Sequence, residues 1–171
     1  MKKVFLIALS LVLMQNFLFA TQPLRNETPE RTSNFTLLDL KNKQFSLSDF
    51  KGKPIILFFW TTWCPYCRKE LKQLNTMHAQ FLRDGVELVA INVEEPVDKV
   101  QKFIGSYPFS FRVLLDTDAE VAQAYGILGV PTYIFINKEG RIVFNNNYFP
   151  QKEYKDLLLN SPGKLTFTNV P

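Results

Sequence analysis

The only two cysteines of this 171-residue chain lie close together, in the stretch Trp63-Cys64-Pro65-Tyr66-Cys67. Two thiols at this spacing can form half of a metal site, a structural disulfide, or a dithiol that opens and closes. Structural zinc takes four ligands, and the only other soft ligand in the sequence is His78. Covalent haem attachment would need a histidine directly after Cys67, where the chain has Arg68. A disulfide across so short a loop would stabilise the fold only weakly, so the spacing favours redox chemistry.

The sequence after Cys64 predicts different roles for the two thiols. Apolar residues recur at helical spacing from Pro65 to Leu82, and a proline suits a first helical turn. Cys64 would then lie at a helix N-terminus, where unpaired amide groups and the helix dipole favour the thiolate. We therefore expect Cys64 to be the accessible nucleophile. Cys67 lies one turn further along and should be shielded by the helix, so it is expected to resolve a mixed disulfide formed at Cys64.

Two continuous apolar runs, Pro54–Trp60 and Val86–Val93, predict strands that are buried on both faces. The first run would place the cysteine motif at the end of a central strand. A second helix should start at Pro96 and run towards Tyr107, and alternating strands and helices predict one α/β domain with a parallel centre. The other expected elements are a hairpin of Phe35–Leu40 and Gln44–Leu47, strands at Phe111–Leu115, Thr132–Ile136 and Arg141–Asn145, and helices at Ala119–Tyr125 and Tyr154–Leu159.

The N-terminus predicts export from the cytoplasm. A basic start is followed by an apolar run from Val4 to Met14, and cleavage is expected after Ala20. A retained membrane anchor is the alternative, but Gln15 and Asn16 interrupt the run before it reaches the roughly 20 residues that a bilayer span needs. The predicted organisation is a signal peptide over 1–20, a flexible lead over 21–33, a folded domain over 34–160 and an irregular tail over 161–171.

The composition supports a globular domain without a nucleic-acid partner. Apolar residues make up 46% of the chain, which is enough to bury a core. The chain carries 20 basic and 16 acidic residues, and removal of residues 1–20 takes away Lys2 and Lys3, leaving 18 against 16. No long basic run is interleaved with aromatic residues. Nucleic-acid binding is therefore not predicted.

Together with the cysteine motif, four further motifs carry a family resemblance. They are Phe35-x-Leu37-x-Asp39, the run LSDFKGKP over 47–54, Asp116-x-Asp118, and Gly129-Val130-Pro131-Thr132. With these motifs, residues 34 to about 158 resemble the thioredoxin-like domain of the TlpA/ResA group of exported thiol-disulfide oxidoreductases. The resemblance implies a central mixed sheet flanked by helices, an N-terminal β-hairpin extension and an inserted helix.

The same resemblance assigns roles around the two thiols. It implies a cis peptide bond at Pro131, with the backbone of Val130 beside Cys64 to pair with an extended substrate. Trp63, Pro65 and Tyr66 are expected to join these two residues in substrate binding.

Deprotonating a buried Cys67 needs a base. Thioredoxins carry a buried aspartate at the position of Phe58, and the resemblance points instead to Glu95, for which a solvated loop acid is the open alternative. Glu70 and Lys69 are expected on a solvated helix face, and His78 in packing.

The function implied by the resemblance is reduction of protein disulfides in the cell envelope, including those of apocytochrome c before haem attachment. No cofactor beyond the Cys64–Cys67 disulfide and no metal is expected. The implied partners are protein thiols or disulfides and a membrane electron donor or acceptor of the DsbD type, with the protein a monomer in the periplasm. A disulfide-forming oxidase is the nearest alternative. A copper or haem chaperone and a peroxidase are further alternatives, although histidine ligands and a peroxidase-type threonine are not recognisable.

Overall fold

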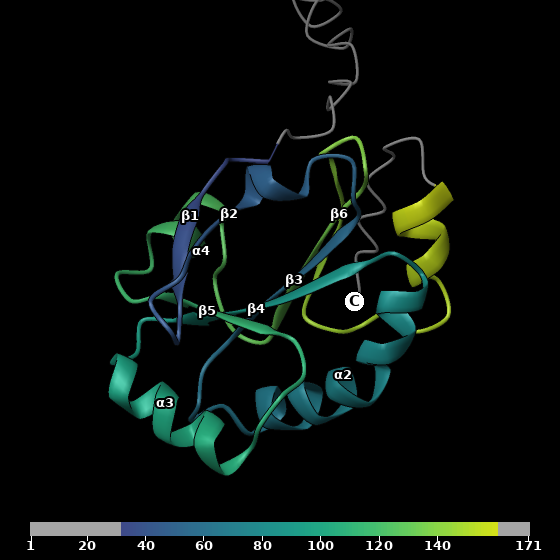
Figure 1. Cartoon of the computed structure of the whole chain (residues 1–171). Coiled ribbons are helices and arrows are strands. Elements are labelled where there is room, and N and C mark those ends of the chain that lie inside the picture. The colour runs from purple at the N-terminus through teal and green to yellow at the C-terminus, as the bar shows by residue number, and fades with distance from the viewer. Residues whose placement is uncertain (1–31, 161–171) are drawn as a thin grey trace, which may run out of the picture.

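The computed structural model describes residues 32–160, and these residues build one mixed sheet with helices on both faces (Figure 1). The sheet has seven strands in the order β2-β1-β5-β4-β3-β6-β7. The strands are β1 Thr36–Asp39, β2 Gln44–Ser46, β3 Ile55–Trp60, β4 Glu87–Val93, β5 Arg112–Asp116, β6 Thr132–Ile136 and β7 Ile142–Asn146. The helical elements are η1 Leu47–Phe50, α2 Pro65–Arg83, α3 Val97–Ser106, α4 Glu120–Ala124 and η2 Asp156–Asn160.

The central strand β3 is buried at every position, as its unbroken apolar sequence predicts. It pairs in parallel with β4 and antiparallel with β6. Side chains alternate between the two faces of a strand, so β3 contributes side chains to two hydrophobic cores, one on each face of the sheet. Ile56, Phe58 and Trp60 pack on the side of α2 and α3, whereas its other side chains pack on the side of η1 and α4. Figure 1 shows α2 and α3 together below the sheet.

This arrangement places the cysteines at the carboxyl end of β3. The strand ends at Trp60 and α2 begins at Pro65, so residues 61–64 leave the sheet at the carboxyl end of β3. Strand β4 runs parallel to β3 and ends at Val93, which brings Glu95 to the same end of the sheet. The chain positions that could carry chemistry therefore meet at one end of the sheet.

The expected elements are confirmed, with shifts of one or two residues at their ends. One element differs in kind. The helix expected over Tyr154–Leu159 has only a short regular start and continues as the π-helix η2. Tyr154 and Leu158 both pack into the buried cluster between the sheet and α2.

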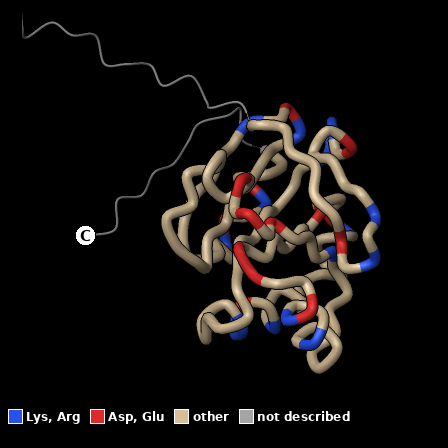
Figure 2. The backbone as a smooth tube through the Cα atoms, turned by 90° about the vertical axis from the view of Figure 1, so that its left-hand side faces the viewer, with Lys and Arg blue, Asp and Glu red and all other residues tan. Residues whose placement is uncertain are grey.

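Some predictions fall outside the described residues. The signal peptide, most of the flexible lead and the tail belong to residues 1–31 and 161–171. Within residues 32–160, no helix has the length and apolar character needed to cross a bilayer. Acidic and basic positions are interspersed along the backbone tube in Figure 2, without a continuous basic track in that view.

Asp84 joins the end of α2 to the C-terminal segment. Its carboxylate accepts hydrogen bonds from Tyr154 Oη at 2.6 Å and Gln80 Nε2 at 2.8 Å, and it pairs with Lys155 Nζ at 3.0 Å. The hydrogen bond from Tyr154, followed by that from Gln80, lowers the pKa of Asp84 to about 2. The ionised carboxylate thus ties Tyr154 and Lys155, which directly precede η2, to the end of α2.

Replacing Asp84 by asparagine should make the domain less stable in a pH-dependent way. The folded-state pKa lies below the unfolded value, so the stabilisation is present above about pH 4 and is lost as the pH falls through about 2. Because the carboxylate is partly in contact with solvent, we expect a loss of about 1 kcal/mol in the free energy of unfolding at neutral pH. Urea unfolding at neutral pH and near pH 2 measures this difference. Tyr154→Phe should reproduce part of the loss, and an equal loss at both pH values would show that the ionised carboxylate is not its source.

Candidate active site

Helix α2 begins directly after Cys64, as the sequence predicts. Cys64 is the N-cap residue, and its Sγ accepts a hydrogen bond of 3.1 Å from the backbone N–H of Cys67. An N–H donor and the helix dipole both stabilise negative charge on that sulfur. The Val130–Pro131 peptide bond is cis, and Cys64 Sγ lies 3.8 Å from the carbonyl oxygen of Val130. Val130 thus lies beside the sulfur of Cys64 and directly precedes the cis bond.

The two thiols differ in exposure in the expected order. Both are free cysteines, with 4% of Cys64 exposed and none of Cys67. Cys64 is less accessible than we expected, because the segment before β6 lies against its sulfur. Trp63 and Tyr66 project into solvent on either side of it, with 62% and 73% of their surfaces exposed. A substrate can therefore reach Cys64 along this rim, whereas Cys67 is closed to it.

Cys67 is held in its protonated form. Burial raises the pKa of the Cys67 thiol, its hydrogen bond with Cys64 raises it further, and a hydrogen bond from the backbone of Thr61 acts in the opposite direction. A thiol attacks as its thiolate, so the second step of any exchange requires that Cys67 loses this proton. A group of the site that accepts this proton would speed the second step.

A groove of about 820 Å³ opens next to Val130, whose carbonyl oxygen lies 3.8 Å from Cys64 Sγ. Its lining combines apolar residues of the segment before β6 with amides at the end of β7 and two residues of α2. The lining residues are Tyr66, Glu70, Gly126–Thr132 and Asn145–Asn147. Three of the predicted substrate-binding residues thus line the groove, together with Leu128, whose side chain is fully exposed. Glu70 is the only carboxylate in this lining.

Glu70 borders this groove as a half-buried residue, so its side chain is less solvated than expected. Its side chain is half-buried and accepts a hydrogen bond of 2.6 Å from Tyr133 Oη. Tyr133 belongs to β6 and is fully buried. Glu70 follows Cys67 by three positions on α2, so both side chains lie on one side of the helix. That spacing was the signal in the sequence, whereas the neighbouring Lys69 is exposed as expected.

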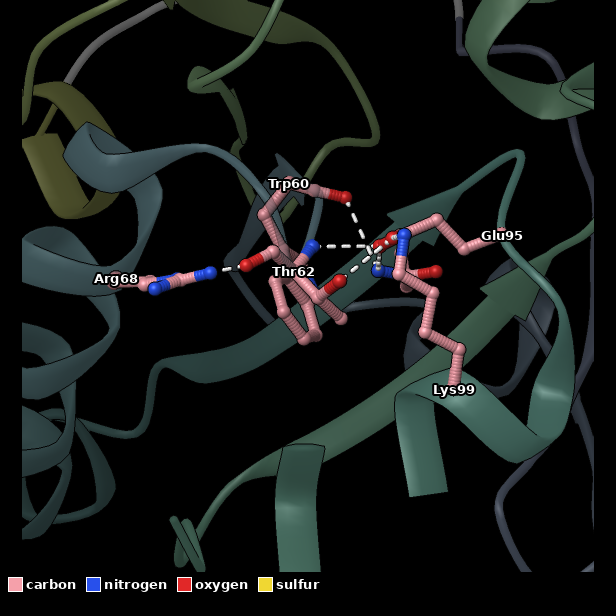
Figure 3. A network of polar contacts seen from close by, with 6 residues as sticks. Trp60, Thr62, Arg68, Glu95 and Lys99 are labelled. Atoms are coloured by element: carbon pink, nitrogen blue, oxygen red, sulfur yellow. Dashed lines mark hydrogen bonds and ion pairs between the residues drawn. The ribbon is translucent and has the colours of Figure 1, made fainter. Parts of the chain in front are cut away.

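Glu95 is also buried, with 4% of its surface exposed, and it lies in a polar network (Figure 3). Its carboxylate accepts hydrogen bonds from Thr62 N at 2.6 Å, Thr62 Oγ1 at 2.7 Å and Asn92 Nδ2 at 2.8 Å, and it pairs with Lys99 Nζ at 2.7 Å. Burial alone would raise the pKa of Glu95, but the bonds from Asn92, Lys99 and Thr62 outweigh burial and lower it. Glu95 is therefore not a solvated loop acid.

The partners of Glu95 indicate what it does in the structure. In residues 32–160, no hydrogen bond joins its carboxylate to either thiol, and its predicted role as proton acceptor stays a prediction. Instead it holds Thr62, which lies two positions before Cys64. Arg68 Nε donates to the carbonyl oxygen of Thr62 at 2.7 Å from the other side. Thr62 is thus fixed at its N–H, its hydroxyl and its carbonyl.

The contacts of His78 confirm the packing role predicted for it. Its Nδ1 lies 2.8 Å from Ser110 Oγ, and its ring meets the edge of Phe111. Burial lowers the pKa of His78, which keeps the ring neutral at neutral pH. Among residues 32–160, no group of three or more His, Cys, Asp or Glu side chains is placed to hold a metal ion.

Comparison with known proteins agrees with this geometry. Residues 29–145 match the model of the AhpC/TSA family. The chain is 37% identical over 137 residues to the thiol-disulfide oxidoreductase ResA of Halalkalibacterium halodurans, covering 80% of this chain and 77% of that protein. It is 44% identical over 110 residues to the ResA protein of Bacillus subtilis, covering 64% of this chain and 62% of that protein.

A solved structure shows the same fold. It is a secreted Mycobacterium tuberculosis disulfide oxidoreductase homologous to the DsbE protein of E. coli, with a TM-score of 0.63 and 28% identity, covering 72% of this chain and 92% of that one. The fold, the paired thiols at the start of α2 and these similarities agree with one another. The chain belongs to the AhpC/TSA family and is a thioredoxin-like thiol-disulfide oxidoreductase.

Proposed function

We propose that this protein is exported and reduces protein disulfides in the cell envelope. The observation that carries the proposal is the asymmetry of the dithiol, in which Cys64 lies at a helix N-terminus and Cys67 is fully buried behind it. Such a pair attacks with one thiol and resolves with the other. A structural disulfide or a metal site would not need this difference.

The exchange proceeds in two balanced steps. The Cys64 thiolate attacks one sulfur of a substrate disulfide, forming a mixed disulfide and releasing the other substrate sulfur as a thiolate. Cys67 then loses its proton and attacks Cys64 Sγ, which forms the Cys64–Cys67 bond and releases the second substrate thiolate. The substrate gains two electrons, and the protein is left oxidised. The backbone of Val130 and the rim of Trp63, Pro65 and Tyr66 hold the substrate chain during both steps.

Glu70 is the proton acceptor that the geometry supports best for the second step. It lies one turn after Cys67 on α2, and it borders the groove, through which a proton can pass to solvent. Glu95 is already saturated by four donor contacts and serves to position Thr62. Glu95 remains the acceptor predicted from the resemblance, so a direct comparison of the two carboxylates is needed.

The reductive direction is proposed from the family resemblance, and the compartment determines which redox partner it needs. The N-terminal sequence predicts export, and the similar Mycobacterium tuberculosis protein is described as secreted. An exported reductase meets an oxidising environment, so a membrane electron donor of the DsbD type must reduce the Cys64–Cys67 disulfide after each turnover. Protein disulfides, including those of apocytochrome c, are the proposed substrates.

Replacing Cys67 by alanine should trap the first intermediate. Without the resolving thiol, the mixed disulfide at Cys64 cannot be released internally, so partners should accumulate as reducible complexes on non-reducing gels of the cell envelope. The matched control, Cys64→Ala, should trap none, because Cys67 is buried. Equal trapping by both variants, or by neither, would contradict the assigned order of attack.

The reduction potential of the Cys64/Cys67 couple should lie nearer to that of thioredoxin, about −270 mV, than to that of DsbA, about −120 mV. Equilibration with glutathione buffers, followed by the change in tryptophan fluorescence or by mass, measures it. The oxidised form should also be the more stable form in urea. A potential near that of DsbA, with a less stable oxidised form, would identify an oxidase instead.

Glu70→Gln should slow the second step and spare the first. When reduced protein in excess meets a chromogenic aryl disulfide, the attack of Cys64 releases one coloured thiolate and the attack of Cys67 releases another. We expect the second release to slow by at least about tenfold, since general-base contributions are typically larger than this. Glu95→Gln should instead change stability and both releases together, because it frees Thr62. Slowing of only the second release by Glu95→Gln, with no effect of Glu70→Gln, would assign the proton acceptor to Glu95.

A further inference from the structure

Tyr133 packs in the same buried cluster as Cys67. It lies on β6 directly opposite Phe58 of β3, and the centroids of the two rings are 4.7 Å apart. Phe58 stands where thioredoxins carry a buried aspartate, so no carboxylate reaches the second thiol from this strand position. The neighbouring strand supplies a hydroxyl instead, because Tyr133 Oη extends to α2 and donates to Glu70 Oε2 at 2.6 Å.

The hydroxyl of Tyr133 keeps its proton and donates it in the hydrogen bond to Glu70. Its side chain is fully buried, and a buried phenol needs a hydrogen-bond partner. Burial, then the hydrogen bond to Glu70 and the negative charge of Glu70, raise the pKa of Tyr133. Tyr133 and Cys67 belong to the same buried cluster between the sheet and α2. Tyr133 thus touches the acid from within the core, while the other side of Glu70 borders the groove.

We infer that Tyr133 is a positioning residue for the second step of exchange, because its buried hydroxyl holds the Glu70 carboxylate on the Cys67 side of α2. This inference rests on the proposed role of Glu70 as proton acceptor. A glutamate side chain on a helix has several rotamers, and without a fixed donor the carboxylate would turn into the groove. The hydrogen bond from Tyr133 therefore selects the rotamer from which Glu70 can receive the proton of Cys67.

Tyr133 should affect only one of the two chemical steps. Cys64 owes its environment to the N–H of Cys67 and to the carbonyl of Val130, neither of which involves Tyr133. Loss of the hydroxyl should therefore leave the first attack unchanged. The second attack needs the proton of Cys67 to move to Glu70, so it should become slower. The bonds that form and break are those of the proposed exchange.

The test uses Tyr133→Phe in the full chain. The assay is the reaction with the chromogenic aryl disulfide, which reports the attack of Cys64 and the attack of Cys67 as two releases of coloured thiolate. We expect the first release of coloured thiolate to be unchanged and the second to slow by roughly fivefold or more. In a Glu70→Gln background, Tyr133→Phe should have no further effect on the second release, because the hydroxyl acts through Glu70.

Tyr125→Phe is the matched control. Tyr125 is also a buried tyrosine, and its hydroxyl donates to the carbonyl oxygen of Ser33 at 2.7 Å, on the other side of the sheet. Its removal should cost a similar hydrogen bond and change neither release.

Three outcomes would overturn the inference. An unchanged second release in Tyr133→Phe would do so while leaving the proposed function intact, provided that Glu70→Gln slows it. Equal slowing by Tyr133→Phe with and without Glu70 would show a merely structural effect. If Glu70→Gln itself leaves the second release unchanged, the proposed proton acceptor fails, and the role of Tyr133 fails with it.

Discussion

The hydrogen bond from the backbone N–H of Cys67 to the sulfur of Cys64 is the contact on which the site depends. It exists because α2 begins at Pro65, which makes Cys64 the N-cap and turns its sulfur towards the free amide groups of the first turn. The same turn draws Cys67 into the core, where water cannot reach it. One local feature of the backbone therefore creates two unlike thiols from two identical residues.

The remaining architecture keeps this turn in place. Strand β3 is anchored by strands on both sides and ends just before the motif, so the segment from Thr61 to Trp63 has little freedom. Thr62 is held by Glu95, from the segment after β4, and by Arg68, from α2 (Figure 3). Burying a carboxylate is costly unless its oxygens are paired, and the donors around Glu95 supply that pairing. The two acids thus differ in their surroundings, since the buried Glu95 holds Thr62 whereas the half-buried Glu70 borders the groove and accepts from Tyr133.

The sequence predicted those features that depend on local patterns. The apolar run of β3, the helix beginning at Pro65 and the N-cap position of Cys64 all follow from a few adjacent residues, and each is confirmed. The family motif added the cis bond before Pro131. By contrast, the contacts of Glu70 with Tyr133 and of Thr62 with Glu95 join residues 63 and 33 positions apart. Such pairs depend on which strands become neighbours in the sheet. The local sequence around a glutamate does not determine whether it becomes buried.

The most direct test of this account is limited alkylation of the reduced protein at neutral pH, with the modified cysteine identified by mass spectrometry. The account predicts that Cys64 is labelled well before Cys67, and that the two are labelled alike once the protein is unfolded in urea. Labelling of Cys67 first, equal labelling of both in the folded protein, or no labelling of either would contradict it.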